Sequence, residues 1–172
     1  LSNGICSLNP GSLRLTISVL INIDQEGCWQ DYTFSPSLIS VDRRMTYDEV
    51  NGILQGDKEL RKEYGTFVQT FEEMAKLAGL LKKRRIKRGA LDFNFPEAKI
   101  ILDERGKPLE IKVRREGLAE SIIEEFMLLC NEVIATHFQE LKVPFVYRIH
   151  EQPEGDKLFA LKNFLSLMNL FP

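Results

Sequence analysis

The sequence predicts an α/β (α+β) fold in which a mixed, largely antiparallel sheet packs against long helices. Odd-numbered residues from Leu13 to Ile23 are all apolar, which is the period of a strand with one buried face. Apolar residues in segments 57–81 and 117–141 instead recur at helical spacing. Turn-forming residues separate these stretches. A length of 172 residues favours a single domain of this mixed class.

Composition narrows the class of protein. The hydrophobic fraction of 44% and the charged fraction of 28% are ordinary for a soluble globular chain, and a net charge of -2 means that any polyanion must meet a local basic patch. Three cysteines without metal-ligand spacing favour a reducing cytoplasm. No apolar run is long enough to span a bilayer, so no membrane partner is expected. The start at Leu1 and the stop after a helical pattern suggest a piece of a longer protein.

The first third of the chain predicts a hairpin followed by helices. Strands Leu13–Ile23 and Cys28–Val41 flank a turn, and Pro36 marks a bulge or a sheet edge. Thr46 and Glu49 have the spacing of a capping box that starts a short helix. Segment 57–81 then predicts one long amphipathic helix, which either packs on the sheet or forms a coiled coil; packing on the sheet is favoured.

A basic run, Lys82–Arg88, follows this helix directly. Six of its seven residues are basic, and the strand pattern Ala90–Phe95 comes next. Positive charge beside aromatic rings is suited to single-stranded nucleic acid, whose phosphates meet the charge and whose bases stack on the rings. The alternative is structural, because cations are also favoured at helix C-termini and a Leu-x-Phe-x-Phe strand is usually core.

The rest of the chain predicts strands 98–102 and 108–113 around a Gly-containing turn, a helix over 117–141, a strand over 145–150 and a final helix over 156–170. On a helical wheel of 117–141, Glu124 and Asn131 fall outside the polar arc that contains Glu125. Because a helix that is apolar around most of its circumference is largely buried, these two side chains need hydrogen-bond partners from the protein, water or a ligand. Glu124 is a buried carboxylate bonded within the protein, or part of the exposed edge of the helix, or the acceptor of a hydrogen bond from a ribose 2′-hydroxyl.

The sequence contains no motif of catalytic residues. Hydrolysis of a phosphodiester with metal ions needs clustered carboxylates, but the aspartates are scattered and the two histidines have no ligand spacing. Glycine-rich phosphate loops and nucleophile elbows are also absent from the sequence. The chain alone is therefore expected to catalyse nothing and to hold no metal.

Several motifs in order nevertheless resemble a known family over essentially the whole chain. They are LSNGICSLNPG, RLTISVLINID, RRMTYDEVNGILQGD, RGALDF, SIIEEFMLLCNEVIATHF and YRIHEQP. Together they resemble the middle of the catalytic (RNB) domain of the ribonuclease II and ribonuclease R family, with the ribonuclease R branch closer. Residues 1–172 are then expected to be part of that domain, truncated at both ends.

The resemblance implies a cytoplasmic, Mg²⁺-dependent, processive exoribonuclease that degrades single-stranded RNA from 3′ to 5′ and releases nucleoside 5′-monophosphates. The family's metal-binding aspartates and its arginine motif lie outside this chain, so no catalytic residue is carried over. By motif, Phe93 matches the phenylalanine that stacks on a base, and Tyr47 and Glu124 match residues associated with ribose recognition.

Other candidate RNA contacts are Asn131, Arg85 and Arg88. For Tyr47, the structural alternative is a packing residue in a capped first turn. Two other function classes stay open: a non-catalytic single-stranded RNA-binding module, and a helical protein-interaction domain whose seam would run from Leu60 to Leu81.

Overall fold

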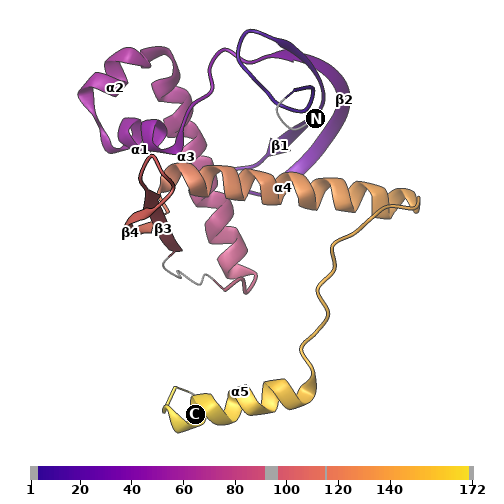
Figure 1. The fold of residues 1–172 in the computed structure, drawn as a ribbon. Helices are drawn as coiled ribbons and strands as arrows, with labels where there is room; N and C mark the ends of the chain where they lie inside the picture. The colour runs from indigo at the N-terminus through magenta and orange to yellow at the C-terminus, as the bar shows by residue number, and fades with distance from the viewer. Residues whose placement is uncertain (1–3, 92–96, 115, 171–172) are drawn as a thin grey trace. The chain divides into compact units, whose positions relative to one another are not determined.

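The computed structural model describes residues 4–91, 97–114 and 116–170. It confirms the α/β class, with two antiparallel two-stranded sheets and helices between and after them (Figure 1). The elements in order are β1 (Leu13–Ile23), β2 (Trp29–Ser40), α1 (Tyr47–Gln55), α2 (Lys58–Glu63), α3 (Gly65–Lys87), β3 (Glu97–Leu102), β4 (Pro108–Arg114), α4 (Leu118–Leu141) and α5 (Gly155–Leu167). The chain divides into two compact units, Leu1–Ile134 and Ala135–Pro172.

The hairpin β1–β2 has the predicted antiparallel pairing, with Val19 opposite Phe34. Pro36 lies opposite Ile17 in regular register, and the one irregularity of the pair falls at Asn22/Ile23. Of the two alternatives for Pro36, the edge is therefore the correct one, because each strand of a two-stranded sheet has a free edge where a missing N–H is tolerated.

The core of the first unit forms where this hairpin meets α3 and α4. Leu81, Leu129 and Val133 are buried and form its centre. Eight apolar side chains pack against them: Val19, Ile21, Ile23, Trp29, Tyr32, Phe34, Leu77 and Phe126. Burying a large apolar side chain contributes roughly 1.5–3 kcal/mol, so this cluster holds the two helices on the hairpin.

The apolar face of β1 is covered along only part of its length, which corrects the expectation of one continuous buried face. Leu13, Leu15 and Ile17 are 63%, 88% and 76% exposed, whereas Val19, Ile21 and Ile23 pack on the core. The alternation was read correctly, but α3 and α4 reach only the end of the hairpin near its turn.

The prediction of one continuous helix over 57–81 is wrong, because the structure has two helices there, α2 and α3. They meet at Tyr64, whose backbone (φ -104, ψ 27) is not helical. Tyr64 is only 4% exposed, and its hydroxyl bonds Glu49 on α1. The break therefore falls at a buried residue that is bonded to another helix.

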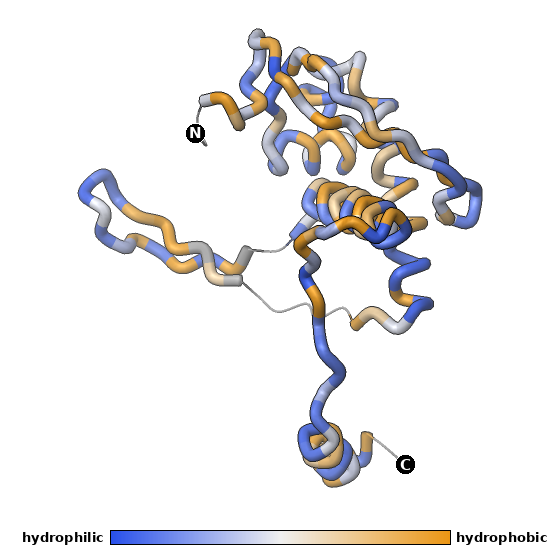
Figure 2. Tube along the Cα trace, turned by 90° about the vertical axis from the view of Figure 1, so that its right-hand side faces the viewer, coloured by the Kyte–Doolittle hydropathy of each residue, from blue (hydrophilic) through white to orange (hydrophobic). Residues whose placement is uncertain are grey.

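The second hairpin, β3–β4, confirms the predicted strands over 98–102 and 108–113, with Ile100 opposite Ile111. Most of its apolar side chains are exposed, and Figure 2 shows hydrophobic stretches on both strands. The predicted strand Ala90–Phe95 lies mostly in residues 92–96, outside the described residues.

The second unit contains the end of α4 and the helix α5. Segment 145–150, predicted as a strand, has no strand structure because it pairs with no other strand among the described residues. Its Phe145 ring instead stacks on the Phe138 ring, with centroids 4.3 Å apart. The segment is otherwise exposed to solvent, so this ring contact replaces the ladder of backbone hydrogen bonds that a strand would have.

Candidate nucleic-acid interface

Tyr47 is the first residue of α1 and lies on the surface, 41% exposed. The predicted capping box is present: Glu49 Oε2 accepts hydrogen bonds from the backbone N–H of Thr46 at 2.7 Å and from its hydroxyl at 2.8 Å. The backbone hydrogen bond from Thr46 is the main reason that the pKa of Glu49 falls from 4.5 to about 2. This box holds the backbone of Tyr47 while its side chain stays open.

A second set of contacts supports the same helix start. The Tyr64 hydroxyl donates to Glu49 Oε1 at 2.9 Å, and the Arg43 guanidinium lies 4.6 Å from the centroid of the Tyr64 ring. Arg43 also contacts the Tyr64 hydroxyl and forms an ion pair with Glu63 at 3.5 Å. Burial is the first cause that raises the pKa of Tyr64 to about 12. A phenol is neutral at physiological pH even without this shift, so Tyr64 acts as a hydrogen-bond donor to Glu49.

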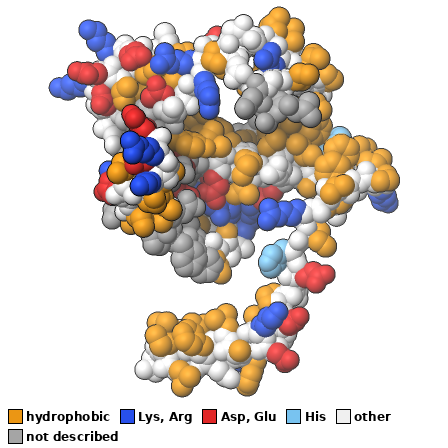
Figure 3. Space-filling view, in the orientation of Figure 1, with side chains coloured by type: hydrophobic (Ala, Val, Ile, Leu, Met, Phe, Trp, Pro, Cys, Tyr) orange, Lys and Arg blue, Asp and Glu red, His pale blue; other side chains and the backbone are white. Residues whose placement is uncertain are grey.

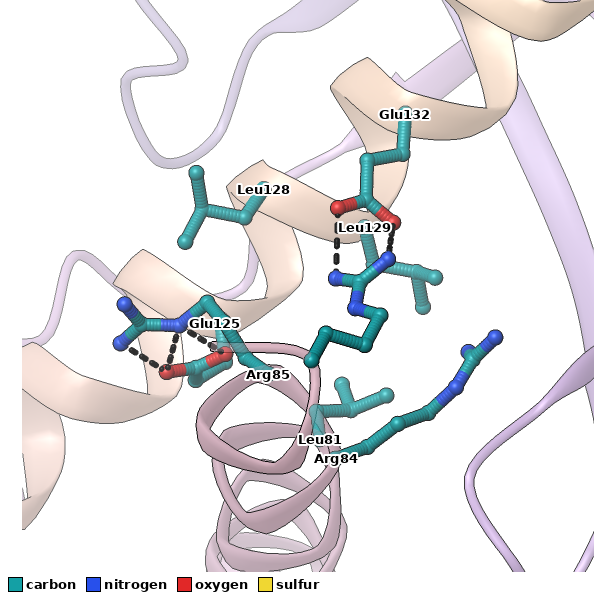
Figure 4. Close-up of a pocket in the computed structure, with 8 residues that line it drawn as sticks. Leu81, Arg84, Arg85, Glu125, Leu128, Leu129 and Glu132 are labelled. Atoms are coloured by element: carbon teal, nitrogen blue, oxygen red, sulfur yellow. Dashed lines mark hydrogen bonds and ion pairs between the residues drawn. The ribbon is translucent and has the colours of Figure 1, made fainter. Parts of the chain in front are cut away.

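Two adjacent glutamates on α4 have opposite environments, and the structure corrects the helical wheel. Glu125, assigned to the polar arc, is only 2% exposed, whereas the Glu124 side chain is 43% exposed. Arg85 at the end of α3 explains the difference (Figure 4). Its Nη2 donates to Glu125 Oε1 at 2.7 Å, and its Nε donates to the two carboxylate oxygens at 3.1 and 3.3 Å.

The Arg85 guanidinium also approaches the exposed glutamate. Its Nη2 lies 3.4 Å from Glu124 Oε1, a long contact beside the short ones to Glu125. Glu124 is thus an accessible carboxylate next to a buried ion pair. Such a group is able to accept a hydrogen bond from a ligand hydroxyl, because its interaction with the cation leaves lone pairs unused.

Asn131, expected to need a partner, is exposed on α4. Its neighbour Glu132 instead pairs with Arg88, whose Nη2 and Nη1 lie 2.8 and 3.2 Å from the carboxylate oxygens. The hydrogen bond with Glu132 is the first cause that raises the pKa of Arg88. Both charges of this second pair are nearly half exposed.

The basic run is therefore largely a packing surface between α3 and the rest of the first unit. Arg84 Nη1 donates to the Gly27 carbonyl at 2.9 Å, and Arg85 and Arg88 face carboxylates. In Figure 3, basic and acidic side chains lie next to each other below α4. The cavity that the three arginines line has a volume of about 20 Å³, room for a water molecule and not for a nucleotide. Lys83 and Lys87, by contrast, are exposed.

Phe93 lies outside the described residues. Within residues 4–91, 97–114 and 116–170, no three His, Cys, Asp or Glu side chains come close enough together to hold a metal ion. The described helices also include none that is long and apolar enough to cross a membrane.

Sequence reasoning missed Arg43, Tyr64 and Glu125 as the groups that support the candidate site. One signal was available for Glu125. Glu125 and Glu132 are spaced two turns apart, and the densest cluster of basic residues in the chain is the run at 82–88. A match between these charges predicts contact between the two helices.

A family model described as "RNB domain" matches residues 1–170. Ribonuclease R 1 of Lactococcus lactis is 45% identical over 170 residues, and Ribonuclease R of Thermotoga maritima is 44% identical over 171 residues. Each alignment covers 99% of this chain but 21% and 24% of the relative, so the chain spans less than a quarter of these proteins.

Solved structures show the same likeness. Mycoplasma genitalium RNase R in complex with ribose methylated single-stranded RNA has a TM-score of 0.85 and 29% identity, over 98% of this chain and 26% of that chain. The same enzyme in complex with double-stranded RNA has a TM-score of 0.86, also at 29% identity, and the match covers 98% of this chain and 30% of that chain. The match of the family model across nearly every residue, together with these identities, shows that this chain belongs to the RNB domain family.

Proposed function

We propose that the protein carrying this chain is a processive 3′-to-5′ exoribonuclease that hydrolyses single-stranded RNA to nucleoside 5′-monophosphates. In this proposal the chain positions the substrate: Tyr47 and Glu124 recognise ribose, and Phe93 stacks on a base. Support comes from relatives named Ribonuclease R and from similar structures of an RNase R bound to RNA.

The observation that carries the proposal is the open carboxylate of Glu124. A ribose 2′-hydroxyl is a donor that DNA lacks, and a carboxylate is a strong acceptor for it. Glu124 is open to a ligand while its neighbour Glu125 is turned inward, so only one carboxylate of this adjacent pair is presented to a ligand. Arg85 lies beside it and offsets part of its charge near an anionic strand. Tyr47 offers a second exposed polar group.

The arginines proposed as RNA contacts have a different role in this proposal. Arg85 and Arg88 hold glutamates of α4, so binding a phosphate would require them to release those carboxylates. Lys83 and Lys87 are exposed one turn apart on α3 and are better placed to attract a phosphate backbone. Asn131 remains a candidate contact because it is exposed two turns after Glu124.

Two further parts of the proposal concern the metal and the compartment. The described residues do not fit a Mg²⁺ site, since they hold no cluster of three ligands. We therefore derive no step through a metal ion from this chain, and the Mg²⁺ ligands of the proposed enzyme would come from elsewhere in the protein. All three cysteines are free thiols, which supports a reducing compartment such as the cytoplasm.

The test compares Glu124→Ala with Glu132→Ala in the full-length protein. Both side chains are on α4, 43% exposed and near an arginine, which makes Glu132 a matched control. The measurement is kcat/KM for an RNA oligonucleotide and for the same oligonucleotide with 2′-deoxyriboses at its 3′ end. We expect Glu124→Ala to reduce the preference for the all-ribose substrate about three- to tenfold, the value of one hydrogen bond.

The control variant should retain the preference. An equal loss on both substrates in Glu124→Ala would indicate a structural role and would contradict ribose recognition by this residue. RNA binding without any cleavage by the full-length wild-type protein would instead support the non-catalytic binding module.

A further inference from the structure

We propose that Asn51 is a positioning residue for ribose recognition, because it clamps α1 to the start of α4 and so sets where Tyr47 stands relative to Glu124. This inference rests on the proposed function. It adds a residue that does not itself touch the RNA but on which selectivity for ribose depends.

The clamp uses both ends of the Asn51 amide. Its Nδ2 donates to Glu120 Oε2 at 2.9 Å, and its Oδ1 accepts from the backbone N–H of Ala119 at 2.9 Å. Glu120 Oε2 also accepts from the backbone N–H of Gly117 at 3.0 Å. Two N–H groups at the start of α4 are therefore satisfied, one by a side chain of α1 and one by Glu120.

The fit around the clamp is close. A Cβ atom added to Gly117 would overlap the Asn51 side-chain amide, so a larger residue at that position would have to push this amide aside. Ala119, which follows, is only 3% exposed. The clamp is therefore a partly buried contact between two helices rather than a surface hydrogen bond.

The spacing along the two helices links the clamp to the candidate site. Tyr47 precedes Asn51 by four residues on α1, and Glu124 follows Glu120 by four residues on α4. Residues four apart lie on the same face of a helix, about one turn along its axis. Tyr47 and Glu124 thus each lie one helical turn from a residue of the clamp. Their side chains are open to solvent, whereas the clamp is partly buried.

A hydrogen bond to a ribose hydroxyl tolerates little displacement, because its strength falls steeply with distance and angle. Loosening the joint would move Tyr47 and Glu124 relative to each other while leaving base stacking and phosphate attraction nearly unchanged. Loss of the clamp should therefore lower the preference for ribose more than it lowers activity on a deoxyribose substrate.

The experiment uses the full-length protein and the two oligonucleotides defined above, all-ribose and 2′-deoxy at the 3′ end. Asn51→Ala removes the clamp, and Gly117→Ala forces its parts apart. We expect each to reduce the ratio of kcat/KM values about three- to tenfold, the range of one lost hydrogen bond. Val50→Ala is the matched control, because it removes buried methyl groups from the same helix and leaves the clamp intact.

A rescue separates positioning from simple damage to the fold. Asn51→Asp alone places two carboxylates against each other. Combining it with Glu120→Gln restores the hydrogen bond between the two side chains with donor and acceptor exchanged. The amide nitrogen that replaces Glu120 Oε2 no longer accepts from the Gly117 N–H, so the pair should recover part of the ratio that Asn51→Asp loses. A pair that recovers none of the ratio, in a variant that melts at the wild-type temperature, would overturn the proposal.

Tyr47→Ala and Glu124→Ala, measured in parallel, distinguish a failure of ribose recognition from a failure of the clamp. If neither changes the ratio, the proposed ribose recognition fails. If both change it and Asn51→Ala does not, only the clamp is refuted. If Val50→Ala lowers the ratio as much as Asn51→Ala, Asn51 is merely structural. In a Glu124→Ala background, the further loss caused by Asn51→Ala should shrink, because its effect passes through that contact.

Discussion

Replacing Arg85 by alanine would leave the Glu125 carboxylate, which is 2% exposed, without the cation that faces it. Removing one partner of a buried ion pair typically destabilises a protein by about 3–5 kcal/mol, because the remaining charge stays desolvated. The Arg85 side chain keeps 19% exposure, so some water would reach the site. We therefore expect the lower end, about 3 kcal/mol. Such a loss is a large part of the stability of an ordinary domain.

Amide hydrogen exchange in the native full-length protein is the suitable assay, since it reports local opening without assuming two-state unfolding. A loss of about 3 kcal/mol corresponds to roughly 100-fold faster exchange of protected amides in α4. Arg88→Ala is the matched control. Its pair with Glu132 is 49% and 43% exposed, so its removal should cost at most about 1 kcal/mol.

A double replacement sharpens the test. Arg85→Met combined with Glu125→Leu removes both charges and keeps apolar volume, so exchange should return near the wild-type rate. The reasoning is refuted if Arg85→Ala accelerates exchange no more than Arg88→Ala does. That result would mean that the apolar cluster around Leu81 and Leu129 holds the helices without help from the ion pair.

Because hydrogen bonds from Thr46 and Tyr64 lower the pKa of Glu49 from 4.5 to about 2, its contribution to stability is complete above about pH 4.5 and is lost as the pH falls toward 2. The gap in melting temperature between wild type and Glu49→Ala should therefore narrow over that range, and a gap independent of pH would contradict this account. Phe93→Ala should weaken binding of single-stranded RNA by about 1–3 kcal/mol in fluorescence anisotropy with EDTA present. Unchanged affinity in a folded variant would remove Phe93 from the site.

Local structure was predictable because its causes are local. The alternation in β1, the capping box at Thr46 and the turn between β3 and β4 depend on residues within a few positions of one another. Each pattern matched the element that the structure shows. The break at Tyr64 was not predictable, because the apolar period continues across it and its cause is a contact with Glu49 on another helix.

The candidate site shows the same division. The motif resemblance predicted Tyr47 and Glu124 as RNA contacts, which stays a prediction, and the structure leaves both side chains exposed. The helical wheel placed Glu124 outside the polar arc and Glu125 within it, yet the buried carboxylate is that of Glu125. A wheel assigns the polar face from the composition of one helix alone. It contains no information about Arg85, which lies on α3. The ion pair with Arg85 makes burial of the Glu125 charge tolerable on an apolar face of α4.

By itself, the sequence determined the type and order of most elements, the density of positive charge at 82–88 and the resemblance to a nuclease family. These properties follow from periodicity, composition and motif spacing, which are all written along the chain. Only the tertiary structure decided which charges the protein uses for its own packing and which it leaves to a partner. The reason is physical: whether Arg85 binds a phosphate or a carboxylate depends on what stands opposite it, and Glu125 is 40 residues away.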